Sequence, residues 1–565
     1  MKLRRFATVA CLMLLTCGGF GAATPPQVPR LDTQHDHDPS VPGSPPKLPA
    51  LLMEGMGATH FPITTSSPEA QKFFDQGLAQ FYAFWFRESE RSFLQAAALD
   101  PSAAMTYWGV AASAAGDALP AFQLPRRSNQ SPVAGSPEAR ARDASRKAME
   151  LRAKASGRER FYIDAQAARR NPSAKDPEND YIKRMRALVA AYPGDLHAKA
   201  MLALALEAGY QPLTKEPRPG TVESLALLRE VLAKDPAHVG AHHYLIHACE
   251  GGKEPESALD SAMRLPQLVP NIPHALHMPG HIYVQTGRWD GAIQAFESAA
   301  LSETAFKSRD AEYPVAHYVH NQVFLIHVLG IQGRYREAIE RSKDLLRISE
   351  SPAELASANG SSAYREGWYA LMKTLVRFEK WTEILDVTTL PAYHRPREKA
   401  WYHFARGLAL ASTGGVAAAD AEFASMRNSL RELSKSTGSV PAQFGVAMAE
   451  LDGYIALKSG NVAGGLEQMK RSVQMEDGLL YNEPSSYLRP VRELLGRALL
   501  SVQEFSAAEK TYHELLRQEP ASGRALRGLA QALQGKGNRV EADRVWREFE
   551  SVWAGADSDV KAPGR

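Results

Sequence analysis

A spacing of 34 residues recurs along this chain and limits the folds open to it. Pro236 and Pro270 are one such interval apart, as are Ala258 and Ala292. Small residues at fixed intervals let neighbouring helices approach closely, and a proline ends a helix because it lacks the backbone N–H. Since each repeat unit packs only on its neighbours, even 565 residues can form one continuous array. The spacing therefore predicts an all-α solenoid rather than several globular domains.

The length of the unit is that of the tetratricopeptide repeat (TPR), a pair of antiparallel helices. In residues 73–101, Gly77, Ser89, Phe93 and Ala96 fall where that repeat places a glycine, a small residue, an aromatic residue and an alanine. Further units are recognised over residues 222–300, 319–346, 400–426, 441–473 and 488–552. We therefore predict an all-α, TPR-like α-solenoid of antiparallel helix pairs.

The expected division of the chain follows from these units and from the proline-rich stretches between them. We expect a signal peptide at 1–23, a Pro-rich flexible linker at 24–50, an N-terminal array with a histidine-lined groove at 51–387, a connecting loop at 388–397, a C-terminal array at 398–552 and a disordered tail at 553–565. Within the first array, residues 117–138 are rich in Pro, Ser and Gly and predict a long loop.

The N-terminus has the three parts of an export signal. Lys2, Arg4 and Arg5 precede an apolar run, and small residues follow at 21–23. We therefore expect a periplasmic or secreted protein. A lipoprotein anchored at Cys17 is the less favoured alternative, because the preceding position wants a small residue and holds threonine here.

Charge and cysteine content narrow the classes of partner. Without the signal peptide, 63 basic residues balance 63 acidic ones, which gives no electrostatic reason to expect nucleic acid or an anionic membrane. No later stretch approaches the roughly 20 apolar residues that a membrane span needs. Cys249 is the one cysteine left, so an intramolecular disulfide and a thiolate zinc cluster are excluded.

Histidines are concentrated in one part of the chain: ten of seventeen fall within 90 residues, starting at position 238. His243 and His247 are four residues apart, so they share one face of a helix. His277 and His281 repeat that pair 34 residues later, at the same place in the next unit. The four imidazoles are therefore expected to form one patch.

Aligning the units puts histidines at the second, fifth and ninth positions of the first helix, which face the concave groove in TPR proteins. The predicted site consists of His243, His247, Glu250, His274, His277, His281, His320 and His327. Neighbouring helix axes are roughly 8 to 10 Å apart, so imidazoles from two helices can reach one ion. Neutral histidines with a carboxylate suit a divalent transition metal, namely zinc, iron, manganese or copper.

The expected function is that of an interaction scaffold with a metal site, which takes a protein or peptide partner in its concave groove. A metal-dependent hydrolase or oxidoreductase is an alternative, with Glu250 as the general base for a metal-bound water. The same carboxylate could instead be a ligand or orient one imidazole. A zinc protease of the HExxH type is excluded, because Tyr244 follows His243. A metal-free peptide groove is the third possibility.

Three local patterns allow two interpretations each. Pro279 lies between the second pair of histidines, where it either distorts a helix or belongs to the first turn of a helix that starts late. Aromatic residues at 81–85 and 107–108 either line a ligand cage or, as helical spacing favours, form core. The HDHD run at 35–38 either holds a metal loosely or is a solvated polar stretch.

Several longer motifs stand out: LLMEGMGATHFPITTSSPEAQKFFDQGL, AHHYLIHACE, HMPGHIY, the HN pair at 320–321 and YNEPSSYLRPVRELLGRALL. Together they resemble a widespread family of exported bacterial TPR proteins, over most of the chain that follows the signal. That family has no agreed activity, so the resemblance implies the fold and the place of the site but no reaction. Tyr481 and Glu483 lie in the last motif, which either curls toward the groove or forms an ordinary loop.

The chain departs from the family at two places. Trp85 and Phe86 stand where the family usually has Asn-His, and Val323 stands where it often has a histidine. His327 could take that role one turn later. If the family's histidines bind metal, this chain has an altered coordination.

Overall fold

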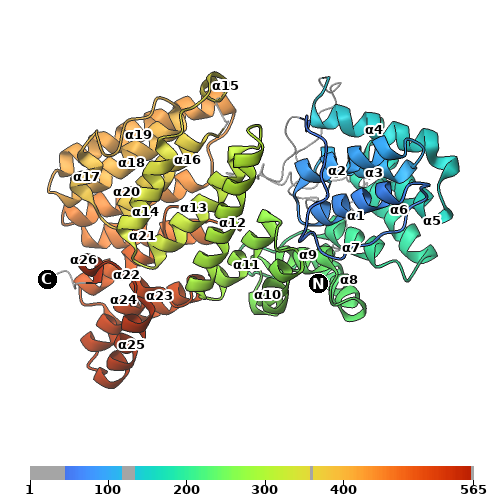
Figure 1. The fold of residues 1–565 in the computed structure, drawn as a ribbon. Coiled ribbons are helices and arrows are strands. Elements are labelled where there is room, and N and C mark those ends of the chain that lie inside the picture. The colour runs from blue at the N-terminus through green and yellow to red at the C-terminus, as the bar shows by residue number, and fades with distance from the viewer. Residues whose placement is uncertain (1–44, 118–133, 357–360, 562–565) are drawn as a thin grey trace, which may run out of the picture. The chain divides into compact units, whose positions relative to one another are not determined.

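The computed structural model describes residues 45–117, 134–356 and 361–561, and over these ranges it contains helices and no strand. The helices follow one another along the chain in adjacent, packed pairs (Figure 1). The prediction of an all-α, TPR-like array of helix pairs is confirmed. The expected signal peptide, the HDHD run, and most of the linker and of the 117–138 loop lie outside the described residues.

The first half of the array runs from α1 to α12, interrupted by two short 3-10 turns. Its helices are α1 (Pro68–Tyr82), α2 (Phe86–Leu99), α3 (Ala104–Ala114), α4 (Pro137–Leu151), α5 (Gly157–Arg169), α6 (Pro177–Ala191), α7 (Leu196–Leu206), α8 (Pro219–Lys234), α9 (Val239–Cys249), α10 (Leu259–Leu268), α11 (Pro273–Gln285) and α12 (Trp289–Arg309), and the 3-10 turns are η1 (Arg152–Lys154) and η2 (Pro255–Ala258).

The second half continues in the same manner to the end of the described chain. Its helices are α13 (Val315–Ile331), α14 (Tyr335–Leu346), α15 (Pro352–Ala356), α16 (Ala363–Arg377), α17 (Trp381–Leu385), α18 (Pro396–Ser412), α19 (Val416–Thr437), α20 (Gln443–Lys458), α21 (Val462–Asp477), α22 (Val491–Ser501), α23 (Phe505–Gln518), α24 (Gly523–Gly535), α25 (Arg539–Val552) and α26 (Ser558–Lys561).

Glycine allows the two helices of a pair to lie close together. A Cβ on Gly77 of α1 would stand 3.0 Å from the ring of Phe93 on α2, as the repeat pattern predicts for these two positions. The constraint is tighter between α11 and α12, where a Cβ on Gly280 would stand 2.3 Å from the ring of Phe296. A Cβ at either position would have to displace the neighbouring ring, slightly at Gly77 and much more at Gly280, so glycine fits there best.

Proline begins several helices, and one proline lies inside a helix. Pro273 opens α11, where its missing N–H costs no hydrogen bond. Pro279 follows six residues later and the helix continues through it to Gln285. The interpretation of a late-starting helix at Pro279 is therefore wrong, and the irregularity lies inside α11, between His277 and His281.

The buried apolar side chains form three clusters. They are built from residues between positions 50 and 313, between 289 and 370, and between 335 and 556. The segment 388–397 is a loop between α17 and α18, but Trp368 before it and Trp401 after it belong to the same cluster. No change of core therefore coincides with the expected boundary between two arrays.

The C-terminal residues are more ordered than the sequence predicts. Trp553 is 2% exposed and donates its indole N–H to the carbonyl of Ile331 at 3.0 Å. Asp557 then accepts a hydrogen bond from the backbone of Arg336, and α26 follows. The expectation of a disordered tail from 553 is thus wrong for residues 553–561, because an aromatic side chain ties the segment to α13 and α14.

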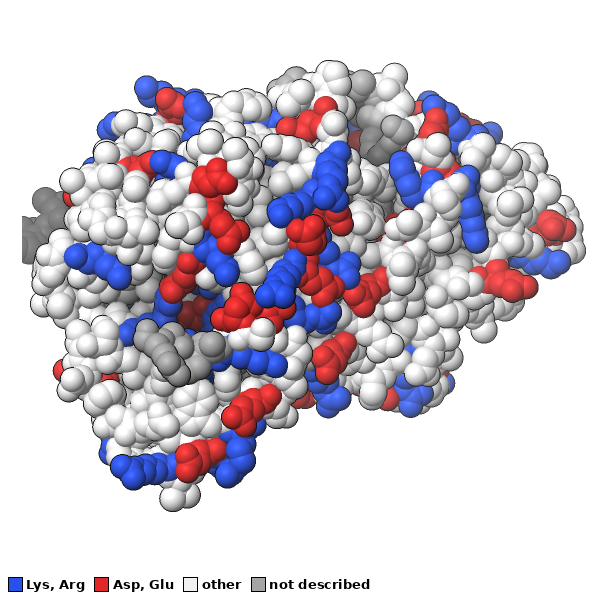
Figure 2. Space-filling model, turned by 60° about the vertical axis from the view of Figure 1, so that its left-hand side comes forward, with Lys and Arg blue, Asp and Glu red and all other residues white. Residues whose placement is uncertain are grey.

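The surface carries both signs of charge. On the face shown in Figure 2, lysines and arginines are interspersed with aspartates and glutamates. Among the helices of the described ranges, none combines the length and apolar character needed to cross a bilayer.

Candidate metal centre

The predicted histidines lie on the first helix of three successive pairs. His243 and His247 are on α9, with Glu250 directly after its end; His274, His277 and His281 are on α11; His320 and His327 are on α13. Helices α9 and α11 pack against each other. The register derived from the 34-residue spacing therefore does bring imidazoles of different repeats together.

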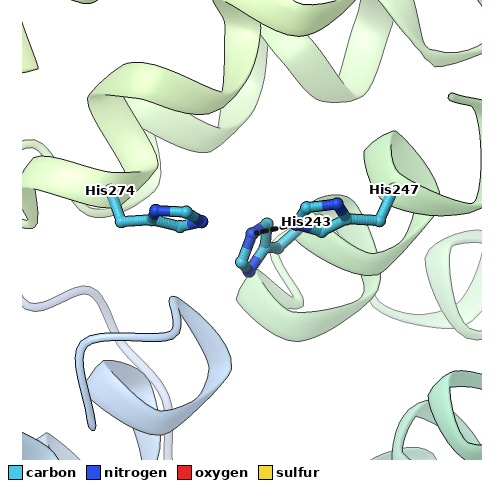
Figure 3. A group of neighbouring side chains, drawn as sticks. All are labelled: His243, His247 and His274. Carbon is cyan, nitrogen blue, oxygen red and sulfur yellow. Dashed lines mark hydrogen bonds between the residues drawn. The ribbon is translucent and has the colours of Figure 1, made fainter. Parts of the chain in front are cut away.

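The first histidine group consists of His243, His247 and His274. Their ring nitrogens all lie within 4.8 Å of one another, and Figure 3 shows the three imidazoles converging from two helices. The Nε2 atoms of His243 and His247 are 3.2 Å apart. The Nε2 atom of His274 is buried and has no hydrogen-bond partner among the described residues.

In His243 and His247, the second ring nitrogen, Nδ1, faces an oxygen. His243 Nδ1 lies 2.5 Å from the carbonyl oxygen of Tyr82, the last residue of α1, whose carbonyl has no partner within its own helix. A carbonyl oxygen only accepts, so the proton of neutral His243 is on Nδ1 and its Nε2 carries the lone pair. His247 Nδ1 lies 3.3 Å from the carboxylate of Glu250, which favours the same tautomer.

The second histidine group consists of His277, His281 and His320. His277 Nδ1 is 2.7 Å from Oδ1 of Asn321, whose amide nitrogen donates to the His317 carbonyl and so keeps Oδ1 toward the ring. The Nε2 atoms of His277 and His281 are 2.8 Å apart. The ring of His320 lies 4.7 Å from that of His277.

Two carboxylates approach the outer nitrogen of His281. Its Nδ1 is 2.8 Å from Glu483 and 3.4 Å from Glu250. Burial raises the pKa of Glu483, which the hydrogen bonds with His281 and Tyr481 counteract. The Tyr481 hydroxyl donates to the other oxygen of this carboxylate, so each oxygen of Glu483 has a polar neighbour.

When the proton of each of these rings is on Nδ1, two Nε2 lone pairs point at each other in both groups. Lone pairs repel at this distance unless a proton or a cation lies between them. Nitrogens bound at about 2.0 to 2.1 Å to one tetrahedral ion are roughly 3.4 Å apart, and about 2.9 Å apart when they subtend a right angle. The observed separations of 3.2 and 2.8 Å therefore fit shared coordination of an ion.

Burial keeps three of the imidazoles neutral, those of His243, His274 and His277. It lowers the pKa of His243, with a further contribution from the neighbouring His247. It lowers the pKa of His277 and His274 in the same way, since removing a cation from water is unfavourable and other imidazoles lie close by. A neutral imidazole is the form that binds a metal ion, and a proton is a poor occupant of the space between two of them.

An aromatic ring packs on each group. The ring of Phe84 lies 4.3, 5.2 and 5.6 Å from those of His243, His247 and His274. Phe84 is in the turn after α1 and has a left-handed backbone, with φ +54°. The neighbouring aromatic residues are buried in the core, as helical spacing favours. Phe84 therefore belongs both to the core and to the wall of the first histidine group.

Phe324 occupies the equivalent place in the second group. Its ring lies 4.8, 5.0 and 4.8 Å from those of His277, His281 and His320. It comes from α13, one turn after His320, and is 2% exposed. Each group thus has three imidazoles, a carboxylate at an outer nitrogen and one phenyl ring.

The segment that carries Glu483 reaches the site through a close contact with the end of α9. Gly251 has φ +74°, and a Cβ there would stand 2.7 Å from the ring of Tyr481. The interpretation that the Tyr481–Glu483 element curls toward the groove is confirmed by the contact between Glu483 and His281. Glycine after Glu250 therefore makes room for the C-terminal part of the site.

His327 lies apart from the other predicted residues. It is two turns beyond His320 on α13 and lines a cavity with Lys373 and Arg377. Burial lowers the pKa of His327 to about 3, and the nearest charges are those two cations. Among described residues no ring contact joins it to another histidine of the site.

Three contributors to the site were not predicted: the Tyr82 carbonyl, Asn321 and Phe324. A backbone carbonyl leaves no trace in a sequence. Phe84 is one of the aromatic residues for which the sequence allowed either a ligand cage or core, and it takes part in both. Asn321 and Phe324 were detectable in principle, because they stand one and four residues after His320 and so remain near it on α13.

Comparison with known proteins gives little beyond this geometry. No protein-family model matches the chain, and no curated protein does. A structure of the human IFIT1 dimer with m7Gppp-AAAA is 12% identical, covering 88% of this chain and 92% of that one with a TM-score of 0.32. A monomeric IFIT1 mutant with Gppp-AAAA is 11% identical, covering 87% of this chain and 92% of that one with a TM-score of 0.31.

Proposed function

We propose that this protein is a metal-binding helical-repeat protein in which each histidine group holds one transition-metal ion. The observation that carries the proposal is the pair of facing Nε2 atoms in each group, at 3.2 and 2.8 Å, with the Nδ1 atoms directed at oxygen acceptors. An outer hydrogen bond of this kind fixes the tautomer and raises the basicity of a histidine ligand.

The placement of the carboxylates narrows the choice of metal. Glu250 and Glu483 approach the outer Nδ1 atoms of the histidines, so the inner ligands of both groups are nitrogens. Imidazole nitrogen suits zinc, copper and iron, whereas manganese prefers oxygen. We therefore expect zinc or copper ahead of iron, and manganese least. In this arrangement Glu250 orients imidazoles, which supports that role over the one of general base.

The direct test is the metal content of full-length protein purified without an affinity tag. We expect close to two equivalents of metal in the wild type and less than half an equivalent in a His247→Ala/His281→Ala double variant. A His513→Ala variant is a suitable control, since that histidine lies on α23 outside both groups. Equal metal in the wild type and the double variant would contradict the proposal, and so would a wild type that takes up no metal from zinc or copper salts.

A metal-dependent enzyme is the second candidate, favoured by one observation. A cavity of about 160 Å³ is lined by His320 and Glu483, both of which also contact the second histidine group. A scaffold that only stores or senses metal has no need of an open cavity beside the ion. Turnover of small organic compounds by the metal-loaded protein, lost in the double variant, would favour the enzyme over the scaffold.

A further inference from the structure

The cavity beside the second histidine group has mainly apolar walls, and two cations, Lys373 and Arg377, belong to its lining. It lies between α13 and α16, with side chains such as Val319, Val323 and Leu488 on its walls. An apolar cavity of roughly 150 Å³ is large enough to hold a benzene ring. The cavity here, at about 160 Å³, can therefore hold a small aromatic or short aliphatic body.

Its carboxylates already have hydrogen-bond donors. Glu366 accepts from the Ser361 hydroxyl at 2.9 Å, Glu354 from the Ser351 backbone at 2.7 Å, and Glu483 lies 2.8 Å from His281. Burial lowers the pKa of Lys373, and of the three carboxylates Glu366 acts electrostatically to raise it. Each acidic side chain of the cavity thus has a polar neighbour besides the lysine.

The two cations of the cavity differ in their partners. Arg377 donates to Glu493 at 2.6 Å and to Glu519 at 2.7 Å, so its charge is compensated within the protein. Among the described residues, Lys373 forms no direct hydrogen bond or ion pair, and Glu366 acts on its ammonium only electrostatically. A partly buried ammonium without a direct hydrogen bond to a carboxylate is less stabilised than the paired Arg377.

We propose that this cavity binds a small organic anion, a carboxylate attached to an apolar or aromatic body, with the Lys373 ammonium as its counter-ion. Burial lowers the pKa of Lys373 to about 8, so the side chain is still mainly charged at neutral pH. His327, on the helix opposite, offers a further ring nitrogen to the same space.

The cavity adjoins the second histidine group, where we propose that a metal ion binds. Because His320 and Glu483 belong to both the cavity wall and the second histidine group, a bound carboxylate would lie next to an ion held there. That part of the inference rests on the proposed function. The binding of the anion by Lys373 does not, because it needs only the cavity and the lysine.

The test uses benzoate and its neutral isostere benzamide as probes, titrated calorimetrically into full-length protein with metal and after removal of metal. We expect benzoate to bind at least about tenfold more tightly than benzamide in both states, as a hydrogen bond between charged groups predicts. Lys373→Met should abolish this preference without changing the metal content. Lys470→Met, an exposed change on α21, is the matched control.

A second variant tests the cavity independently, in case Lys373→Met does not fold. Val323→Trp fills the cavity while keeping Lys373, and should weaken both probes together, with an unchanged circular dichroism spectrum. Four results would each overturn the proposal. They are equal affinity for benzoate and benzamide, preference for benzamidine over both, absence of any binding at millimolar concentration, and full benzoate binding by Lys373→Met. Benzoate preference in a protein that takes up no metal would instead leave this site standing and contradict the proposed function alone.

Discussion

The two histidine groups have imidazoles at the same places of successive repeats, yet their surroundings differ. The first group is closed by Phe84, which comes from a strained turn, and by the backbone carbonyl of Tyr82. The second is bordered by side chains, Asn321 and Glu483, and by a cavity. The repeat reproduces the imidazoles, while the residues around them decide which group a small molecule can reach.

If each group holds an ion, this difference predicts a division of labour between the two. A phenyl ring packs on all three imidazoles of each group, so the difference lies in the cavity, which adjoins the second group only. An ion in the second group would have His320 between it and open space. We therefore expect the first site to be structural and slowly exchanging, and the second to be the reactive one.

The largest expected effect is the loss of metal from one histidine group while the other keeps its ion. His243→Ala removes one of the two facing nitrogens of the first group only, and His277→Ala does the same in the second. Each should lower metal affinity at its own site more than about 100-fold, since removal of a ligand costs more than removal of its outer partner. Plasma mass spectrometry should then find one equivalent in place of two. If either single variant loses both ions, the groups form one shared site.

The next effect concerns the two phenyl rings. Phe84→Ala and Phe324→Ala each empty a buried ring position and should lower the free energy of unfolding by about 3 to 5 kcal/mol, measured by urea denaturation. Phe84→Gly should be about 1 kcal/mol more stable than Phe84→Ala, because glycine adopts the left-handed backbone at no steric cost. No such gain is expected for Phe324→Gly, which lies inside α13. A gain there and none at position 84 would contradict the distinction.

The smallest effect tests the outer carboxylates. Glu483→Gln weakens the acceptor at His281 and should reduce metal affinity about 10- to 100-fold at the second site only. Glu250→Gln should reduce it at both sites, since that carboxylate approaches His247 as well as His281. Competition with a coloured chelator resolves the two affinities. Equal effects of Glu483→Gln on both sites would mean that the C-terminal segment acts through the fold rather than through His281.

The fold and the meeting of the histidines could be predicted from the spacing alone. A 34-residue interval fixes which helix positions are neighbours, and it placed His243 beside His247 and His277 beside His281 in the same patch. The paired positions Gly77 and Phe93 likewise pack as the repeat pattern predicts. Periodicity is informative here because every unit meets its neighbours in the same way.

The surroundings of the site could not be predicted in this way. The carbonyl of Tyr82 acts through the backbone, and Glu483 arrives from more than 200 residues away through a contact at Gly251. Lys373 belongs to no motif, and its place in the wall of the cavity is what makes it notable. Such features depend on which loops and helix ends meet, and that is not encoded in a regular period.

Glu250 gives the pair of sites a property that neither has alone. One carboxylate oxygen stands 3.3 Å from Nδ1 of His247 and 3.4 Å from Nδ1 of His281. An ion bound to either imidazole makes its N–H more acidic and draws the carboxylate toward it, at the expense of the other. If both groups bind metal, we therefore expect their filling to be negatively cooperative, an effect to which the repulsion between two cations would add. Because a coupling free energy is reciprocal, whichever ion binds first weakens the second by the same factor.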